Sequence, residues 1–312
     1  MDVRRTLFEG VPGPFHLMVP SAAGRRPSPA LVYHVRDSPE AHAASISAGG
    51  LRVTDPCFTL LTLATELTPV RLAMAIYEMA GRFAAYRPSP RLAERIDVMR
   101  RDGGLSELMP WKPAFDVNGE HTGLWRRPPL VTLDELIRFA CRTRGMRGRV
   151  GLSRSLRMVF GVAASPLEAR AALLFGLPAS RGGEGLGAPE LNVRINLSNQ
   201  ARSIANREYC VADLLYRGSG VIVDIECMGV AYHLDETRRR LDANRTTALR
   251  CMGVEVIQIT HADLANPVRL HEISGMVARL IGKRRREKTG EYLKREEALR
   301  SEVFCNWEDI CR

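Results

Sequence analysis

The segment VIVDIEC, Val221 to Cys227, holds two carboxylates among residues that belong in a protein interior. Side chains alternate between the two faces of a strand, so Asp224 and Glu226 would point to the same face. Two like charges side by side on a buried face are costly unless a cation or a proton neutralises one of them. The segment therefore predicts a metal site, in which one acid is protonated or ion-paired when the metal is absent.

The residues on either side predict the elements that position this segment. Ser165 is typical of a helix N-cap, with Pro166 in the first turn, Glu168 three residues after the cap and Gly176 at the end. The next stretches, LNVRINL and YCVADLLY, predict two strands, and VIVDIEC predicts a third. A helix through RRRLDANRTTALRCMG, a strand VEVIQIT and a helix PVRLHEISGMVARLIG follow. The predicted order is helix, three strands, helix, strand, helix.

This order, and the residues in it, resemble the Vsr-like endonuclease domains of the PD-(D/E)xK nuclease superfamily. The counterparts of the family's motifs are SPLEA, Asp213, ECMG followed by His233, DANRTTALRCMG and VIQIT. The resemblance covers about residues 165–282 and implies an α/β fold with an α-β-β-β-α-β, restriction-endonuclease-like core at the C-terminal side. The preceding half, a mixed α+β domain, resembles the N-terminal portion of bacterial proteins related to abortive-infection toxin-antitoxin regulators.

The resemblance implies hydrolysis of a phosphodiester with the help of Mg²⁺ or Mn²⁺. Asp213 and Glu226 would be the metal ligands, held rigidly by two adjacent strands. Such a metal, bound by one or two carboxylates, activates a water and neutralises charge on the phosphoryl and leaving oxygens. Asp213 interrupts the apolar stretch VADLLY without a turn to explain it, which favours a role in the site.

Two further acids have more than one interpretation. Glu168 matches the helix glutamate that faces the site in the family, but a glutamate at this distance from Ser165 is also explained by a capping box. Asp224 could replace Glu226 as a metal ligand, or could be neutralised by an arginine. The motif match favours Glu226.

The resemblance also suggests roles for residues outside the acids. His233 could orient a water or contact phosphate, and Gln258 lies on the strand where related nucleases sometimes carry a polar site residue. Arg245 could contact a phosphate of the nucleic acid. Asp242 and Arg245 are also one helical turn apart, which favours a surface ion pair.

One position departs from the family pattern. The second residue after Glu226 is usually Asp in this family and Lys in the wider superfamily, but here it is Met228. A thioether is a poor ligand for Mg²⁺ and cannot act as a base or supply a charge to an oxyanion. Cys227 beside it is typical of a small core residue. The site therefore keeps its two main acids and lacks a third charged group.

The charge of the chain favours a polyanionic partner. Lys and Arg total 45 against 35 Asp and Glu, giving a formal net charge of +10. Contacts to phosphates release counterions and give affinity that does not depend on sequence, so we expect a nucleic-acid partner, and DNA in particular. The excess is almost entirely arginine, which a bias in base composition would also produce.

The sequence indicates neither a membrane span nor an export signal. Apolar runs such as FTLLTLATEL are interrupted well short of the roughly 18 to 20 residues that cross a bilayer. The N-terminus MDVRRTLFEGVPG has no apolar region after its arginines. The seven cysteines are scattered, without a C-x-x-C pair, and we interpret them as reduced thiols in a cytoplasmic protein.

We expect three parts along the chain: a mixed α+β domain over 1–150, the nuclease-like domain over 151–284, and a charged helical tail over 285–312. In the first part FHLMV and ALVYHV predict strands, and capped helices are expected after Asp55 and Thr68. Thr132 with Glu135 predicts a capping box. The region 88–129 predicts one helix at most, and a further helix is expected over 153–162.

The tail predicts a sparse apolar stripe that either folds back on the body or meets a partner. Its members are Tyr292, Leu299, Val303 and Trp307. Two functions remain open for the whole chain. One is a metal-dependent DNA endonuclease acting in repair, in a mobile element or in phage defence. The other is a degenerate nuclease fold that binds nucleic acid or a partner protein without cutting, as a regulator or antitoxin-like component.

Overall fold

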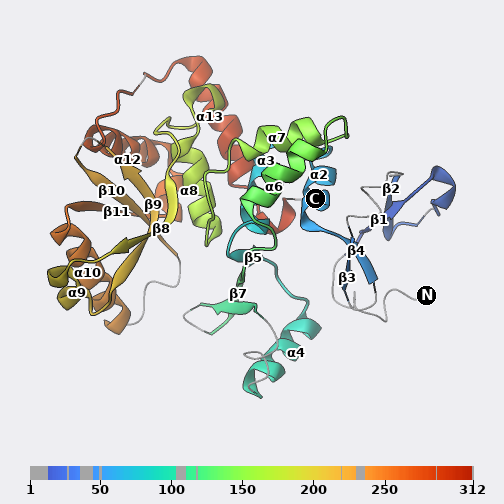
Figure 1. Cartoon of the computed structure of the whole chain (residues 1–312), viewed down its shortest axis with the longest axis horizontal. Helices are drawn as coiled ribbons and strands as arrows, with labels where there is room; N and C mark the ends of the chain where they lie inside the picture. The colour runs from blue at the N-terminus through green and yellow to red at the C-terminus, as the bar shows by residue number, and fades with distance from the viewer. Residues whose placement is uncertain are drawn as a thin grey trace.

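The chain folds into a mixed α/β structure with four sheets among its described residues, as the coarse prediction from the sequence requires (Figure 1). The structure is a computed structural model. It describes residues 13–26, 28–35, 45–48, 51–102, 110–116, 119–218, 220–229, 236–285 and 287–310.

The N-terminal strands form two small ribbons at one end of the molecule (Figure 1). β1 (Phe15–Val19) pairs in parallel with β2 (Leu31–Val35), and these are the two strands predicted from FHLMV and ALVYHV. β3 (Ser45–Ala48) pairs antiparallel with β4 (Leu51–Thr54). The prediction of a strand-rich start is confirmed.

The helices predicted after Asp55 and Thr68 are present with their caps. α2 (Pro56–Leu63) begins where the Asp55 side chain accepts a hydrogen bond from the backbone N–H of Phe58. α3 (Pro69–Met79) begins where the Thr68 hydroxyl accepts from the N–H of Arg71. Each helix has proline in its first turn, where a missing N–H costs nothing.

The region 88–129 contains more structure than the sequence predicts. α4 (Pro90–Arg101) is the expected helix. In addition the region contains β6 (Lys112–Phe115) and β7 (His121–Arg126), which form a three-stranded sheet with the preceding β5 (Phe83–Ala85) in the order β5-β7-β6. Pro113 in an edge strand and Gly123 in the central strand conceal the strand pattern, because both residues are disfavoured in strands.

Two helices lead to the second half of the chain. α6 (Leu133–Arg142) starts with the predicted capping box between Thr132 and Glu135. α7 (Arg149–Leu156) starts and ends earlier than predicted, because Gly148 has a positive φ of 96° and precedes the first turn. A Cβ on Gly148 would collide with the carbonyl of Leu61, so this glycine permits the close approach of α7 to α2.

The second half of the chain contains the predicted helix-strand-strand-strand-helix-strand-helix order. Its elements are α8 (Pro166–Gly176), β8 (Glu190–Asn196), α9 (Asn199–Ala205), β9 (Tyr209–Arg217), β10 (Ile222–Met228), α10 (Glu236–Cys251), β11 (Val254–Thr260), α11 (His261–Ala265) and α12 (Pro267–Leu280). The short helices α9 and α11 were not predicted. The strands form one sheet in the order β11-β10-β9-β8. It is mixed, as predicted, because β10 and β11 are parallel and the other pairs antiparallel.

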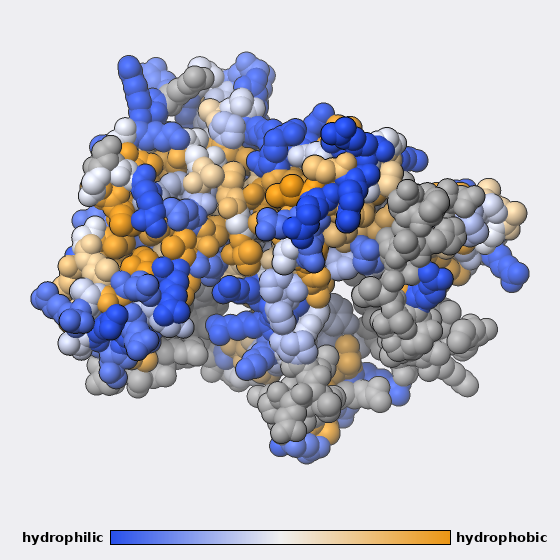
Figure 2. Space-filling model, in the orientation of Figure 1, coloured by the Kyte–Doolittle hydropathy of each residue, from blue (hydrophilic) through white to orange (hydrophobic). Residues whose placement is uncertain are grey.

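Helices cover both faces of this sheet (Figure 1). Val223 and Ile225 of β10 belong to a large apolar core that also contains residues of α8 and α12. On the other face, Ile222 of β10 packs against a smaller core that contains Ala201 of α9 and Leu249 of α10. Figure 2 shows apolar residues gathered over α8 and the sheet, with hydrophilic residues around them.

The large core continues across the expected boundary at residue 150. It includes Ile76 and Tyr77 of α3, Leu173 of α8, Leu214 of β9 and Trp307 near the C-terminus. The division into an N-terminal domain and a nuclease-like domain therefore stays a prediction, while the buried side chains of the two halves contact one another in a single cluster.

The tail folds back on the body, which was one of the two predicted outcomes. α13 (Gly290–Val303) is followed by a short 3₁₀ turn, η5 (Trp307–Asp309). The four residues of the predicted apolar stripe are all buried. The indole N–H of Trp307 donates to Glu78 at the C-terminal end of α3, with a nitrogen-to-oxygen distance of 2.7 Å.

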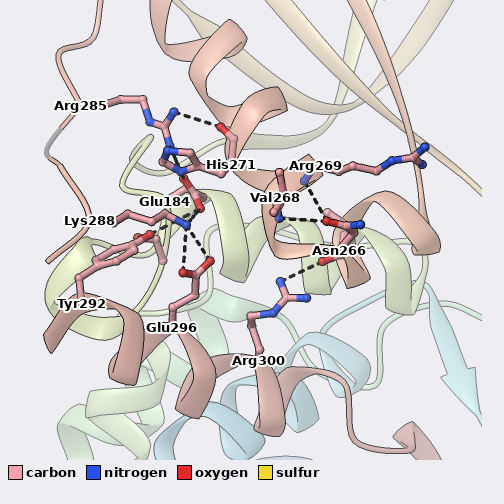
Figure 3. A network of polar contacts seen from close by, with 12 residues as sticks. Glu184, Asn266, Val268, Arg269, His271, Arg285, Lys288, Tyr292, Glu296 and Arg300 are labelled. Carbon is pink, nitrogen blue, oxygen red and sulfur yellow. Dashed lines mark hydrogen bonds and ion pairs between the residues drawn. The ribbon is translucent and has the colours of Figure 1, made fainter. Parts of the chain in front are cut away.

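A polar network fastens the start of the tail to the second half of the chain (Figure 3). The Glu184 carboxylate is buried and accepts from Arg285 at 2.5 Å and from Lys288 at 3.0 Å. Lys288 also contacts Glu296 of α13 at 2.8 Å. Burial raises the pKa of Glu184, but Lys288, His271 and Arg285 more than offset this, and the pKa is lowered overall.

We expect Tyr292→Phe to destabilise the protein by about 1 kcal/mol, because the buried Tyr292 hydroxyl donates to the carbonyl of Gly183 at 3.2 Å and this acceptor would lose its partner. Urea unfolding measures the free energy. The matched control is Tyr209→Phe, since Tyr209 is 42% exposed and water can replace its hydroxyl. Equal stability of the two variants would contradict the proposed role of Tyr292 in fastening the tail.

Within the residues that the structure describes, none of the helices is long and apolar enough to span a membrane.

Candidate functional site

The four-stranded sheet forks next to the predicted acids. β9 and β10 pair from Ile222 with Arg217 to Ile225 with Leu214, and the ladder stops there. β10 stays paired with β11 as far as Met228, and β9 stays paired with β8 as far as Tyr209. The two central strands therefore separate at the positions of Asp213 and Glu226, which places both residues at the fork.

Strands β8 and β9 change face at the same level. Leu191 and Leu214 are paired and contact the large core, whereas Ile195 and Cys210, an even number of residues along each strand, contact the smaller core. An undistorted strand would keep them on one face. Asn192, which lies between these pairs on β8, has a positive φ of 51° and marks the level at which β8 changes face.

Asp213 fills the gap left by the separating strands. Its Oδ2 atom accepts a hydrogen bond from the backbone N–H of Cys227 at 2.8 Å, so the side chain replaces a ladder bond. Burial, followed by the charges of Glu226 and Glu168, raises the pKa of Asp213 to about 8, against the lowering effect of the Cys227 N–H and Arg245. Asp213 is therefore mainly protonated at neutral pH.

Asp224 and Glu226 lie on the face of the smaller core, two residues apart on β10, as the strand period predicts. Asp224 is fully buried, and Glu226 is 4% exposed. Asp224 and Glu226 form a side-chain hydrogen bond with each other, and no other described residue donates to either oxygen of Asp224 or to Oε1 of Glu226. Burial and the adjacent Glu226 raise the pKa of Asp224 to about 10. The first interpretation of the sequence, that one acid holds a proton without a metal, agrees with this shift.

Arg245 of α10 bridges the fork. Its guanidinium donates to Oε2 of Glu226 on β10 and to the carbonyl of Val211 on β9. The side chain is 17% exposed, and the side chain of Asp242, the partner expected from the sequence, lies outside the described residues, so the predicted ion pair stays a prediction. Burial lowers the pKa of Arg245, but the hydrogen bond and charge of Glu226 outweigh this and raise it overall. The guanidinium stays charged and neutralises Glu226.

Glu168 contacts the cluster from α8 and is held by cap-type hydrogen bonds. Its carboxylate accepts from the Ser165 hydroxyl at 2.9 Å, from the Ala164 N–H at 2.7 Å and from the Asn192 amide at 2.6 Å. Burial raises the pKa of Glu168, these hydrogen bonds lower it, and the charge of Glu226 raises it further, so the pKa is raised overall. Only half of the predicted capping box is present, because the Ser165 hydroxyl accepts from the N–H of Glu168, whereas the Glu168 carboxylate accepts from the N–H of Ala164 and not from that of Ser165. Glu168 also lies within electrostatic range of Glu226, and its role in the site stays a prediction.

Of the remaining predicted residues, two lie near Glu226 and one lies outside the described residues. Gln258 pairs with Glu226 in the β10–β11 ladder and is exposed beside it. Met228 pairs with Thr260, two residues beyond Glu226 on the same face, and is half-buried. His233 lies outside the described residues. The sequence did not indicate that Asn192 contacts Glu168, because a polar residue in an alternating strand predicts a side chain that faces solvent.

The donor set at the fork suits a hard divalent cation. Mg²⁺ prefers oxygen ligands, is commonly held by one or two carboxylates, and keeps several waters. The buried oxygens of Asp224 and Glu226, which have no donor other than Arg245 and each other among the described residues, supply such ligands. Among the described residues, no group of three or more His, Cys, Asp or Glu side chains is arranged to hold a metal. A cation at the fork would therefore rely on two acids and water, and Oε2 of Glu226 would have to release Arg245 to take part.

Comparison with known proteins finds no protein family, curated protein or solved structure that matches this chain.

Proposed function

We propose that this protein is a metal-dependent endonuclease that hydrolyses phosphodiester bonds of DNA, with a restriction-endonuclease-like core of the Vsr-like type. The observation that carries the proposal is the pair of buried acids Asp224 and Glu226 at the fork, with Asp213 beside them: apart from Arg245 and their own mutual hydrogen bond, no described residue donates to their carboxyl oxygens. Buried acids without donors are costly in a protein that has no use for them.

The residues at the fork would divide the work. Glu226, with Asp213 or Asp224, would hold Mg²⁺ or Mn²⁺, and the ion would lower the pKa of a bound water and neutralise charge on the phosphate. Glu168 would fix the geometry through Asn192. Gln258, which is exposed next to Glu226, would contact a water or a phosphate oxygen, and His233 is a second candidate for this role.

A basic and aromatic surface near the fork supports a nucleic-acid partner. The Arg194 guanidinium lies 3.9 Å from the centroid of the Tyr209 ring, and both side chains are exposed. Arg194 pairs across the ladder with Val211, whose carbonyl binds Arg245. Together with a net charge of +10, this surface would attract a phosphate backbone toward the acids. Repair, mobile-element activity and phage defence are settings that fit such an enzyme.

The second candidate is a nuclease fold that binds nucleic acid or a partner protein without cutting it. Two observations favour it. Met228 supplies no charge next to Glu226, and Arg245 already neutralises Glu226. A regulator or antitoxin-like component would need the basic surface but not the metal.

We expect weak nicking of supercoiled plasmid DNA by the natural chain in Mg²⁺ or Mn²⁺, and stronger nicking by Met228→Asp. An added carboxylate on the Glu226 face restores a third charged group, and the loss of one such group typically costs a factor of about 10² to 10³. Met228→Leu is the matched control, because it keeps the volume and adds no charge. Gel-shift binding is measured alongside at one salt concentration.

The two candidate functions give different results in this assay. Metal-dependent nicking that rises in Met228→Asp and not in Met228→Leu supports the endonuclease. Salt-sensitive DNA binding without nicking in all three proteins favours the binding function instead.

A further inference from the structure

The acid cluster at the fork has a basic partner from within the chain. Arg245 lies between the separated strands, hydrogen-bonded to the Glu226 carboxylate on one side and to the Val211 carbonyl on the other. Its position on α10, far along the chain from both partners, means that the packing of α10 against the sheet determines where the guanidinium lies. The guanidinium is thus part of the fork.

The ion pair with Arg245 leaves most carboxyl oxygens of the acid cluster without a donor from another part of the chain. Arg245 donates to one oxygen of Glu226, whereas the remaining oxygens of Glu226 and Asp224 have only the hydrogen bond between the two acids and no other donor among the described residues. A guanidinium has five N–H groups fixed in one plane. It therefore cannot contact oxygens of two neighbouring carboxylates from all sides, as a small spherical ion can. The arrangement neutralises charge without satisfying all the oxygens.

We propose that Arg245 is the resident counter-ion of this site, and that a divalent cation binds to Asp224 and Glu226 by displacing the Arg245 guanidinium from Glu226. The proposal rests on the proposed function because it concerns the same acids, and it selects Asp224 rather than Asp213 as the second ligand. Arg245 would therefore lower the affinity of the site for a metal ion.

Competition follows from charge and space. A Mg²⁺ or Mn²⁺ ion needs carboxylate oxygens within about 2.0 to 2.2 Å, and the oxygen that Arg245 occupies is one of the few that this site offers. A guanidinium and a divalent cation on one buried carboxylate repel each other strongly, because few water molecules separate them. The side chain of Arg245 retains 17% exposure, so it has a path toward solvent.

The test measures binding of Mn²⁺ alone to the full-length chain, without nucleic acid, by the electron paramagnetic resonance signal of free Mn²⁺. We expect Arg245→Gln to bind Mn²⁺ at least tenfold more tightly than the natural chain. Arg245→Lys keeps a charge and is expected to gain much less. The matched control is Arg250→Gln, since Arg250 lies exposed in the last turn of the same helix. Adding Asp224→Asn to Arg245→Gln should remove the gain.

Circular dichroism establishes that each variant is folded. If Arg245→Gln is not folded, a gain in Mn²⁺ affinity by Arg245→Lys that is absent from Arg250→Gln supports the proposal, and no gain overturns it. Unchanged or weaker Mn²⁺ binding by a folded Arg245→Gln, or no binding by any variant, overturns the proposal. The nicking assay separates the two hypotheses. If Arg245→Gln binds Mn²⁺ more tightly but no variant nicks DNA, the counter-ion proposal stands and the endonuclease proposal is rejected. If nicking depends on metal but Mn²⁺ binding does not change in the Arg245 variants, the endonuclease proposal stands and the counter-ion proposal is rejected.

Discussion

Replacement of Glu226 by Gln is expected to abolish both the nicking of plasmid DNA and the binding of Mn²⁺. The amide keeps the shape of the side chain and removes the charge that a divalent cation requires. Glu226 is the acid that contacts Arg245 and acts on the pKa of Glu168, Asp213 and Asp224, so it lies at the centre of the cluster. Nicking should fall by at least the factor of about 10² to 10³ that loss of one charge-stabilising group costs.

The fold should survive this replacement, because the amide oxygen of Gln can still accept the hydrogen bond of Arg245. Circular dichroism verifies it. The matched control is Glu255→Gln on the neighbouring strand β11, where the carboxylate is exposed. Nicking that persists in Glu226→Gln would mean a contaminating nuclease or another site, and the endonuclease proposal would be withdrawn.

Local signals in the sequence predicted most of the elements that form the site. The N-caps at Thr132 and Ser165 accept the expected backbone N–H groups, and the alternation in LNVRINL corresponds to β8. These signals succeed because a cap or a strand period depends on residues a few positions apart. The positions of Asp224 and Glu226 on one face follow from the same periodicity.

The fork itself could not be predicted from local patterns. Arg245 reaches Glu226 from 19 residues away, through the packing of α10 on the sheet. Its spacing from Asp242 indicates only a possible contact within the helix, and no local rule predicts a contact with Glu226 on a strand. The residue type at position 192 does not predict the positive φ of Asn192, since asparagine is also common as an outward-facing strand residue. These two residues decide how the acids are held, and both depend on long-range contacts.

The short helices were missed for a different reason. α9 has a Ser198 N-cap and ends at Asn206 with a positive φ of 51°, both of which are signals visible in LSNQARSIANREY. The segment lies between two strong strand patterns, and its seven helical residues carry little apolar periodicity. Signals from caps alone would have found it.

The second large effect is expected in the dependence of stability on pH. Asp213 and Asp224 have folded-state pKa values of about 8 and about 10, raised mainly by burial, whereas an unfolded Asp titrates near pH 3.9. Between these values the native state binds a proton that the unfolded state lacks, so the free energy of unfolding falls as pH rises. Each acid contributes a slope of up to about 1.4 kcal/mol per pH unit. Stability from these groups is complete below about pH 4 and is lost as pH approaches 8 and 10.

Asp224→Asn should flatten this dependence, because an amide stays neutral across the whole range. The variant should match the natural chain near pH 4, and above pH 6 it should be the more stable protein, by a margin that grows with pH. Urea unfolding in metal-free buffer at several pH values measures this. The control with the opposite sign is Asp263→Asn, since hydrogen bonds from Thr260 lower the pKa of Asp263 and its stabilisation is lost as pH falls. A natural chain whose stability is flat between pH 5 and 8 would show that the acids at the fork are ionised without a metal, and Arg245 alone would then have to balance them.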